Sequence, residues 1–293
     1  MDTESHEFWD FSFDESARMD YPAIVDYILE KTGFEKLNFV GYSMGTTQYL
    51  IFLSERPEYN DKIQVGYLLG PTAFFEHTGM SSCDYPDTCL EFMVCTFCLY
   101  LGMLFKSMTI KPVESMTFLL KLTGLNELMS KNYADWVYES CTQTEDTLYQ
   151  CLKFWAWNGF ELPQSEFFKM INQPGGVSVK TLLHYIQLSY GSGTKFQKFD
   201  YGNPEINVQK YGQIQPPSYN LSRISAQTEL FAGFSDTISA LKDVHTLVEI
   251  LPKAKLHVVK DPEWNHYDFA YSTNVNEMVF DPLIHDMERR WPL

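Results

Sequence analysis

The stretch Lys36-Leu37-Asn38-Phe39-Val40-Gly41-Tyr42-Ser43-Met44-Gly45 decides the fold. Its first five residues are typical of a short apolar strand, and the segment from Thr46 to Ser54 predicts a helix. Between them, Ser43 lies in a Gly-x-Ser-x-Gly turn. In such a turn the small glycines let strand and helix approach closely, and the serine takes a strained conformation that points its oxygen out of the sheet.

Strand and helix alternate on both sides of this turn. Upstream, Asp20-Tyr21-Pro22 predicts the start of a helix that ends at Gly33. Downstream, Ile63 to Leu69 predicts a strand that ends at Gly70-Pro71. Near the C-terminus the pattern predicts strands at 229–232 and 256–259, with helices at 240–250 and about 274–289. This alternation is typical of an α/β protein whose mostly parallel sheet is covered by helices.

The middle of the chain interrupts the alternation. From about residue 72 to 220 the sequence is aromatic, helical and irregular, with breaks such as Pro174-Gly175-Gly176. We interpret it as an inserted cap or lid. The predicted organisation is a first part of the core at 1–71, the cap at 72–220 and a second part of the core at 221–293.

The composition excludes several classes of protein. With 22 Lys and Arg against 38 Asp and Glu, the net charge of −16 disfavours nucleic acid as a partner. The apolar run from Cys89 to Phe105 contains Glu91 and is shorter than the ~20 residues of a membrane-spanning helix, so no transmembrane segment is expected. It is interpreted as a buried cap helix or as the apolar rim of an acyl pocket. The first ten residues are acidic and polar and do not predict a signal peptide.

A serine hydroxyl needs a base to become a nucleophile. Asp236 follows the strand at 229–232, and His266 follows the last strand, which gives the chain order Ser, Asp, His that is usual for an α/β-hydrolase. The Met44 N–H, at the start of a helix, is the predicted oxyanion donor. The alternatives are a structural Gly-rich turn at Ser43 and a turn or helix-cap role for Asp236. The other six histidines lack this setting.

Six cysteines fall in the middle of the chain: Cys83, Cys89, Cys95, Cys98, Cys141 and Cys151. The spacing of Cys95 and Cys98 is that of a metal motif, but no second Cys-x-x-Cys or His cluster accompanies it. We expect no metal site and no cofactor. The pairing of the first four cysteines stays open.

With these residues in view, the whole chain resembles the acid lipase family, which contains gastric and lysosomal acid lipases and many insect lipases. The resemblance lies in the segment Glu7 to Glu15, in Gly41 to Thr47, in Gly233-Phe234-Ser235-Asp236 and in Asn265-His266-Tyr267-Asp268-Phe269. It implies an α/β-hydrolase fold with an inserted cap. It also implies a Ser43, Asp236 and His266 triad that hydrolyses neutral lipid esters, triacylglycerols or sterol esters, at a lipid–water interface.

The resemblance has two further implications. Cys141 and Cys151 match the cap disulfide of the family, and Pro216 to Ser222 resembles a segment that carries an N-glycan, here on Asn220. Both features imply a secreted or lysosomal protein, whereas the chain as given shows no signal peptide.

The chain departs from the family at two places. Tyr42 and Met44 stand where relatives usually have His and Gln. The family also has first sheet strands and a His-Gly loop that supplies a second oxyanion N–H, and this sequence contains no His-Gly pair. One hypothesis is an incomplete version of a secreted lipase, with an unpaired apolar edge at 36–40. The alternatives are a non-catalytic, lipid-binding or degenerate lipase-like protein, and an unrelated esterase for small soluble esters.

Overall fold

The computed structural model describes residues 5, 7–78, 127–128, 135, 138–149, 176–190 and 194–291. The chain divides into two compact units, which we treat separately. The core unit comprises Phe11–Asp84, His184–Phe269 and Asn274–Leu293, and the second unit comprises Met1–Asp10, Tyr85–Leu183 and Ala270–Thr273. The predicted core and cap boundaries at 71 and 220 stay a prediction.

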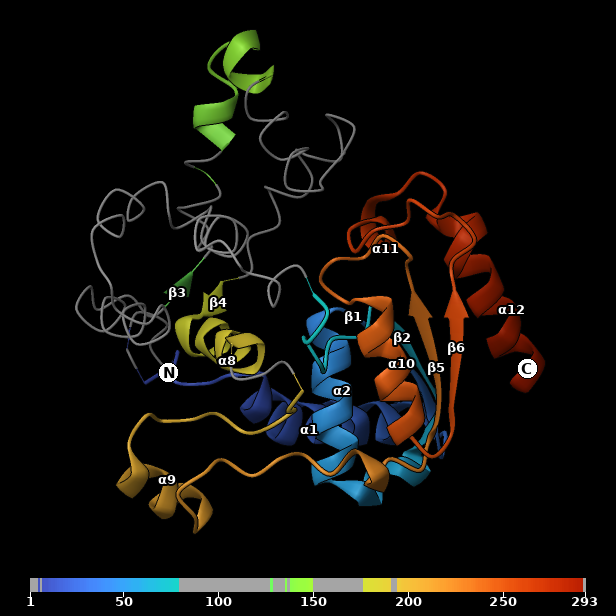
Figure 1. Cartoon of the computed structure of the whole chain (residues 1–293). Coiled ribbons are helices and arrows are strands. Elements are labelled where there is room, and N and C mark those ends of the chain that lie inside the picture. The colour runs from blue at the N-terminus through green and yellow to red at the C-terminus, as the bar shows by residue number, and fades with distance from the viewer. Residues whose placement is uncertain are drawn as a thin grey trace. The chain divides into compact units, whose positions relative to one another are not determined.

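A four-stranded parallel sheet forms the centre of the core unit (Figure 1). Its order is β1-β2-β5-β6, with β1 at Leu37–Tyr42, β2 at Ile63–Leu69, β5 at Gln227–Ala232 and β6 at Ala254–Val258. Tyr42 pairs with Leu69, and Leu69 with Phe231, so the carboxyl ends of three strands are level. The parallel sheet is as predicted, and the predicted strand at 63–69 is confirmed at both ends.

Helices cover both faces of this sheet. Figure 1 shows α2 (Met44–Glu55) and α10 (Leu241–Ile250) on one side of it and α12 (Asp281–Arg290) on the other. A π-helical turn at Asn276–Phe280 leads into α12, and 3-10 turns occupy Pro57–Lys62 and Leu221–Arg223. Helix α9 spans Pro204–Tyr211. Helices α8 (Val179–Tyr190) and α11 (Asp268–Tyr271) are divided between the two units.

Helix α1 (Phe13–Thr32) begins earlier than the sequence predicts. Its N-cap is Ser12, whose side chain accepts from the Asp14 N–H, while Glu15 accepts from the Ser12 N–H at 2.8 Å. This capping box satisfies the free donors of the first turn. The predicted start at Asp20 to Pro22 is therefore wrong, because a stronger cap lies upstream.

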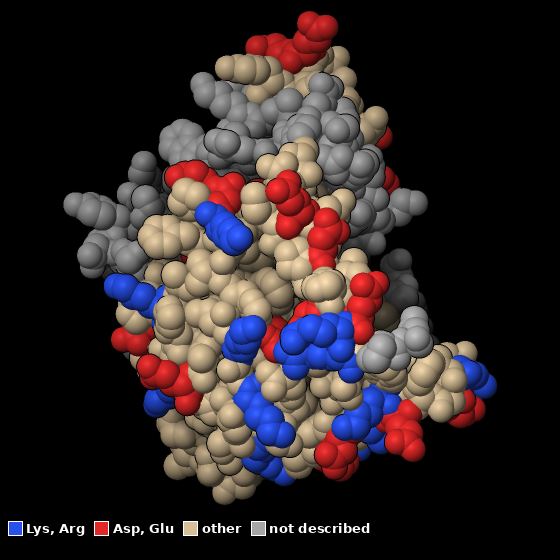
Figure 2. All heavy atoms as spheres, turned by 90° about the vertical axis from the view of Figure 1, so that its right-hand side faces the viewer, with Lys and Arg blue, Asp and Glu red and all other residues tan. Residues whose placement is uncertain are grey.

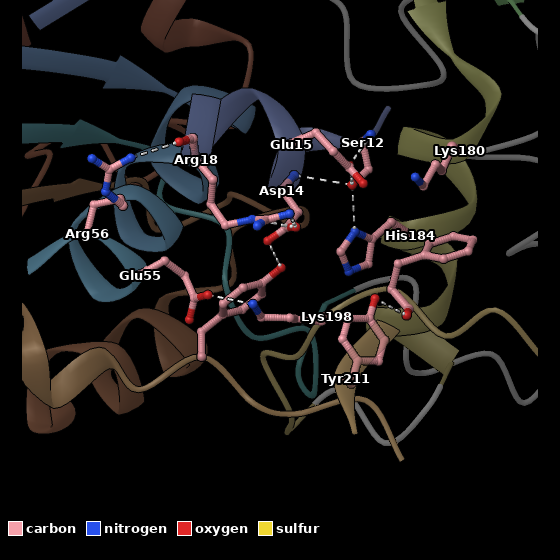
Figure 3. Close-up of polar contacts among 12 residues, drawn as sticks. Ser12, Asp14, Glu15, Arg18, Glu55, Arg56, Lys180, His184, Lys198 and Tyr211 are labelled. Atoms are coloured by element: carbon pink, nitrogen blue, oxygen red, sulfur yellow. Dashed lines mark hydrogen bonds and ion pairs between the residues drawn. The ribbon is translucent and has the colours of Figure 1, made fainter. Parts of the chain in front are cut away.

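Pro22 lies inside α1, where proline normally breaks a helix because it has no N–H to donate. The carbonyl that it leaves without a helical donor is that of Arg18, four residues earlier. Arg56 Nη1, just after α2, donates to this carbonyl at 3.4 Å (Figure 3). The replacement donor allows α1 to continue to Gly33, which closes it in the left-handed conformation, as predicted.

Two sets of side chains fix the sheet between its helices. On the α12 face, a buried cluster joins the strands to the last helix: Val65, Tyr67, Leu69, Phe231, Val259, Trp264, Phe269, Val279 and Leu283. On the α2 face, the fully buried Tyr49 lies against Gly66 of β2, and its hydroxyl is 3.3 Å from Thr228 Oγ1. At the end of the strand order, β1 leaves Val40 half exposed, in keeping with the predicted apolar edge.

Ion pairs tie α12 to the middle of the sheet. Glu229 of β5 is buried and bonds both Arg290 of α12 and His257 Nε2, the latter at 2.6 Å. Arg290 also bonds Asp286, which accepts from the Tyr67 hydroxyl at 2.9 Å. Burial raises the pKa of Asp286, but hydrogen bonds from Arg289, Arg290 and Tyr67 outweigh it and lower the pKa overall.

The second unit contains a short antiparallel pair, β3 (Glu127–Leu128) and β4 (Val177–Ser178), with Glu127 opposite Ser178. Cys141, in a helical segment, is disulfide-bonded. Its predicted partner Cys151 lies outside the described residues, as do Cys83, Cys89, Cys95 and Cys98.

The surface carries charges of both signs despite the acidic composition. Figure 2 shows the face on which β6 and α12 lie, with basic and acidic side chains interspersed among uncharged ones. Among the described residues, no helix is both long enough and apolar enough to cross a bilayer.

Replacing Gly66 by alanine is expected to destabilise the core unit. The new Cβ would lie 2.3 Å from Tyr49 Oη and 2.4 Å from Cζ, inside a packed core, so we expect a loss of about 1–3 kcal/mol. Thermal unfolding followed by circular dichroism measures it. The control is Gly45→Ala, whose Cβ meets nothing within 4 Å; equal unfolding temperatures for the two variants would contradict the packing described.

Asp286 is expected to make stability depend on pH in the acid range. A carboxyl whose pKa is lowered on folding stabilises the fold fully above its unfolded-state pKa, at about pH 4, and this contribution is lost as the pH falls through the folded-state pKa. Asp286→Asn should therefore lower Tm at pH 7 and flatten the fall of Tm between about pH 5 and pH 3. The exposed Asp61→Asn is the control. Identical Tm profiles for Asp286→Asn and the unmodified chain would exclude this role.

Candidate active site

Ser43 occupies the turn between β1 and α2 with φ of 51° and ψ of −116°. It is the non-glycine residue with positive φ in the described part of the chain. Such a conformation costs about 1–3 kcal/mol and persists where the surroundings enforce it. A Cβ at Gly41 would lie 2.9 Å from the Gly45 carbonyl carbon, so this turn requires glycine at 41. The predicted sharp turn is present.

Hydroxyl groups hold the turn in place. The Ser43 N–H donates to the Leu69 carbonyl at 3.0 Å, and the Thr72 hydroxyl donates to the Ser43 carbonyl at 3.1 Å. Thr47 Oγ1 lies 2.7 Å from Thr72 Oγ1 and 2.9 Å from the Tyr185 hydroxyl. Burial raises the pKa of Tyr185 to about 12, so its phenol stays neutral in this cluster. These bonds support the strained backbone of Ser43 from β2 and from α8.

The imidazole of His266 bridges Ser43 and Asp236. His266 Nε2 is 2.8 Å from Ser43 Oγ, and His266 Nδ1 is 2.8 Å from Asp236 Oδ2. His266 and Asp236 are both 4% exposed. An ionised Asp236 can only accept hydrogen bonds, so Nδ1 carries the hydrogen and Nε2 is free to accept a hydrogen bond from the serine hydroxyl.

The second oxygen of Asp236 is held by backbone groups. Oδ1 accepts from the Ile238 N–H at 2.9 Å and from the Ser239 N–H at 2.6 Å. Asp236 thus forms the turn contacts of the structural alternative and also contacts the imidazole, because a carboxylate has an oxygen for each. The Ser239 hydroxyl donates to the Pro71 carbonyl at 2.6 Å, which links this loop to the end of β2.

Gly70 is a residue of the site that sequence reasoning missed. It has a φ of 56°, and a Cβ there would lie 3.0 Å from two ring atoms of His266 and 3.4 Å from Asp236 Oδ2. The absent side chain leaves the space that the imidazole and carboxylate fill. The Gly70-Pro71 pair was read as a strand end, and its position at the carboxyl edge of the sheet was the available signal.

The remaining predicted site residues lie as follows. Met44 is the first residue of α2, so its N–H is one of those that the helix leaves unbonded at its start. Asn220 is exposed, and its Oδ1 accepts from the Ser222 N–H at 3.2 Å. Its glycosylation and the pairing of Cys141 with Cys151 stay predictions.

Histidines outside this site have other partners. His184 is buried, with Nε2 2.9 Å from the Gln197 carbonyl, and it stacks on Phe13. His77 Nδ1 is 2.8 Å from Asp243 Oδ1. Glu76, His77 and Asp243 each offer one possible metal-ligating atom, and these three atoms lie within 4.8 Å of one another. Glu76 and His77 are exposed.

This fold and this site define a class. A strained serine between a parallel strand and a helix, bridged by histidine to an aspartate that follows another strand of the same sheet, is the arrangement of an α/β-hydrolase. Residues 5–94 match the family described as alpha/beta hydrolase fold.

The chain is similar to several lipases. It is 33% identical to Lipase 3 of Drosophila melanogaster, 31% to gastric triacylglycerol lipase of Mus musculus and 30% to Lipase member K of Mus musculus. The matches cover 92%, 96% and 98% of this chain, and 64%, 65% and 67% of the respective relatives. The chain belongs to the acid lipase family, and it spans about two thirds of the length of these relatives.

Gly70→Ala is expected to displace the imidazole of His266. We expect covalent labelling of Ser43 by a fluorophosphonate to slow at least about tenfold, because a small misplacement of the base reduces the rate by this factor or more. The labelling rate is followed by mass spectrometry. Gly212→Ala is the matched control, because its φ of 74° imposes similar strain while its Cβ meets nothing within 4 Å. If both variants label at the unmodified rate, the packing of Gly70 against the imidazole is not what places it.

Proposed function

We propose that the chain is a serine hydrolase that cleaves carboxylic esters of neutral lipids through an acyl-enzyme. The observation that carries this proposal is the contact of His266 with Ser43 Oγ and Asp236 Oδ2, each at 2.8 Å. A base within hydrogen-bond reach of a hydroxyl, itself oriented by a third group, is the arrangement that nucleophilic catalysis requires.

The residues have distinct roles in the proposed reaction. Ser43 Oγ attacks the ester carbonyl as His266 Nε2 takes its proton, and Asp236 stabilises the imidazolium. The tetrahedral oxyanion accepts from the Met44 N–H at the start of α2. Its collapse breaks the ester C–O bond, and His266 returns the proton to the leaving alcohol. Water, activated by the same imidazole, then releases the acid and restores Ser43.

The proposed substrates are triacylglycerols or sterol esters at a lipid–water interface. Support comes from the relatives, one of which is named as a triacylglycerol lipase. The disulfide at Cys141 and the sequence Asn220-Leu221-Ser222, in which Asn220 and Ser222 are exposed, support passage through an oxidising, secretory compartment. A secreted or lysosomal location is therefore proposed with this function.

An assay of residues 1–293 tests the chain with one proposed oxyanion donor, the Met44 N–H. The family resemblance assigns a second donor to a His-Gly loop, and this sequence contains no His-Gly pair. Loss of one donor typically raises the barrier by about 3 kcal/mol, on the order of a hundredfold in rate. The alternatives are a non-catalytic, lipid-binding or degenerate lipase-like protein and an esterase for small soluble esters.

The test compares the unmodified chain with Ser43→Ala and with the exposed-serine control Ser225→Ala. We expect fluorophosphonate labelling and ester hydrolysis in the unmodified chain and the control, and a loss of about 10⁴-fold or more in Ser43→Ala. Substrates are p-nitrophenyl esters of increasing acyl length and emulsified triacylglycerol.

Three results would contradict the proposal in different ways. Absence of labelling with retained binding of a fluorescent fatty acid would identify the non-catalytic alternative. A preference for short soluble esters over emulsified triacylglycerol would identify a small-ester esterase. Equal hydrolysis by Ser43→Ala would place the chemistry elsewhere.

A further inference from the structure

Tyr42 is the last residue of β1 and directly precedes the nucleophilic turn. Its ring packs against the buried cluster on the α12 face of the sheet, next to Phe269 at a centroid distance of 6.5 Å. Its hydroxyl donates to the main-chain carbonyl of His266 at 2.9 Å. The ring centroids of Tyr42 and His266 lie 5.2 Å apart, and the two ring planes are tilted by 32°. The side chain therefore runs from the strand of the serine to the backbone of the base.

His266 needs such a contact because it lies in an irregular segment between β6 and α11. Several bonds of this segment are local: the Asn265 N–H donates to Asp268 Oδ2 at 2.7 Å, and the Tyr267 N–H donates to Asn265 Oδ1 at 2.8 Å. These bonds shape the segment but do not fix its distance from Ser43. The Trp264 carbonyl accepts from the Ser235 N–H at 3.1 Å, which joins the segment to the loop of Asp236.

We infer that Tyr42 is a positioning residue that sets the distance between the base and the nucleophile, an inference that rests on the proposed function. The contacts form a closed ring. Ser43 is bonded through the main chain to Tyr42, and the Tyr42 hydroxyl donates to the His266 carbonyl. The His266 imidazole closes the ring, because its Nε2 is 2.8 Å from Ser43 Oγ. An aromatic side chain has two rotatable bonds, so it holds such a ring at little entropic cost.

The Tyr42 hydroxyl donates to the main-chain carbonyl of His266 and not to its imidazole, and this determines the expected effect of its removal on the rate. Tyr42 fixes where the imidazole lies and donates nothing to its nitrogens. Its loss should reduce the rate of the chemical step at every pH, without altering the midpoint of the pH profile. The position shows His in most family members, as the sequence resemblance indicates. A histidine side chain is shorter than tyrosine and has no phenol hydroxyl, so it would not make the same bond from this position.

The test is Tyr42→Phe, which keeps the ring and removes the hydroxyl. With a fluorophosphonate at saturating concentrations we expect the limiting rate of Ser43 labelling to fall about tenfold, with little change in the half-saturating concentration. The matched control is Tyr59→Phe, which removes a hydroxyl bonded to Asp26 Oδ2 at 2.7 Å and should lower Tm without changing the limiting rate.

A second measurement does not depend on activity. Hydrogen exchange of the amides from 263 to 269 should be faster in Tyr42→Phe than in the unmodified chain, because the segment has lost its anchor to β1. An unchanged limiting rate, a shifted pH midpoint or unchanged exchange would each overturn the inference. If the unmodified chain is not labelled at all, the proposed function fails, and the exchange measurement alone still decides whether Tyr42 holds the segment.

Discussion

The site depends on one contact geometry, in which the His266 imidazole touches an alcohol on one nitrogen and a carboxylate on the other. The three side chains are distant in sequence and come from three different connections of the sheet. They meet because β1, β5 and β6, which precede Ser43, Asp236 and His266, end at the same edge of the parallel sheet: Tyr42 and Phe231 are level across β2, and Ala232 pairs with Val258. At this edge Gly70, directly after β2, leaves space for the imidazole and the carboxylate, and Ser239, in the loop between β5 and α10, donates to the Pro71 carbonyl. The proposed chemistry therefore depends on the parallel arrangement of the strands.

Much of this was predictable because the signals are local. The elbow has its own glycine spacing, the strand at 63–69 ends at Gly70-Pro71, and the acid and base each follow a strand. Since parallel strands end at one edge of a sheet, these positions imply that Ser43, Asp236 and His266 converge, and the distances of 2.8 Å show that they do. The competing view of Asp236 as a turn residue was also sound, because its second oxygen performs that role.

Contacts between segments far apart in sequence were not predictable. Asp20 and Pro22 resemble a helix start, but α1 begins at Ser12 because a capping box forms there and because Arg56 supplies the donor that Pro22 removes. The sequence marks Tyr42 as a departure from the family motif but assigns no partner to its hydroxyl, which donates to the His266 carbonyl. The sequence marks Gly70 only as the end of a strand and does not pair it with His266. The capping box of Ser12 and Glu15 is local and could have been read from the sequence. The other partners lie dozens to hundreds of residues away, and a single sequence does not pair them.

The bridging imidazole is tested most directly by NMR of the chain with ¹⁵N-labelled histidine. A carboxylate that accepts from Nδ1–H in a buried site should give a downfield proton resonance that exchanges slowly with solvent and is coupled to His266 Nδ1. We predict that this resonance is present in the unmodified chain, disappears in Asp236→Ala and persists in Ser43→Ala. A resonance that survives Asp236→Ala, or none in the unmodified chain, would contradict the contact on which the site is built.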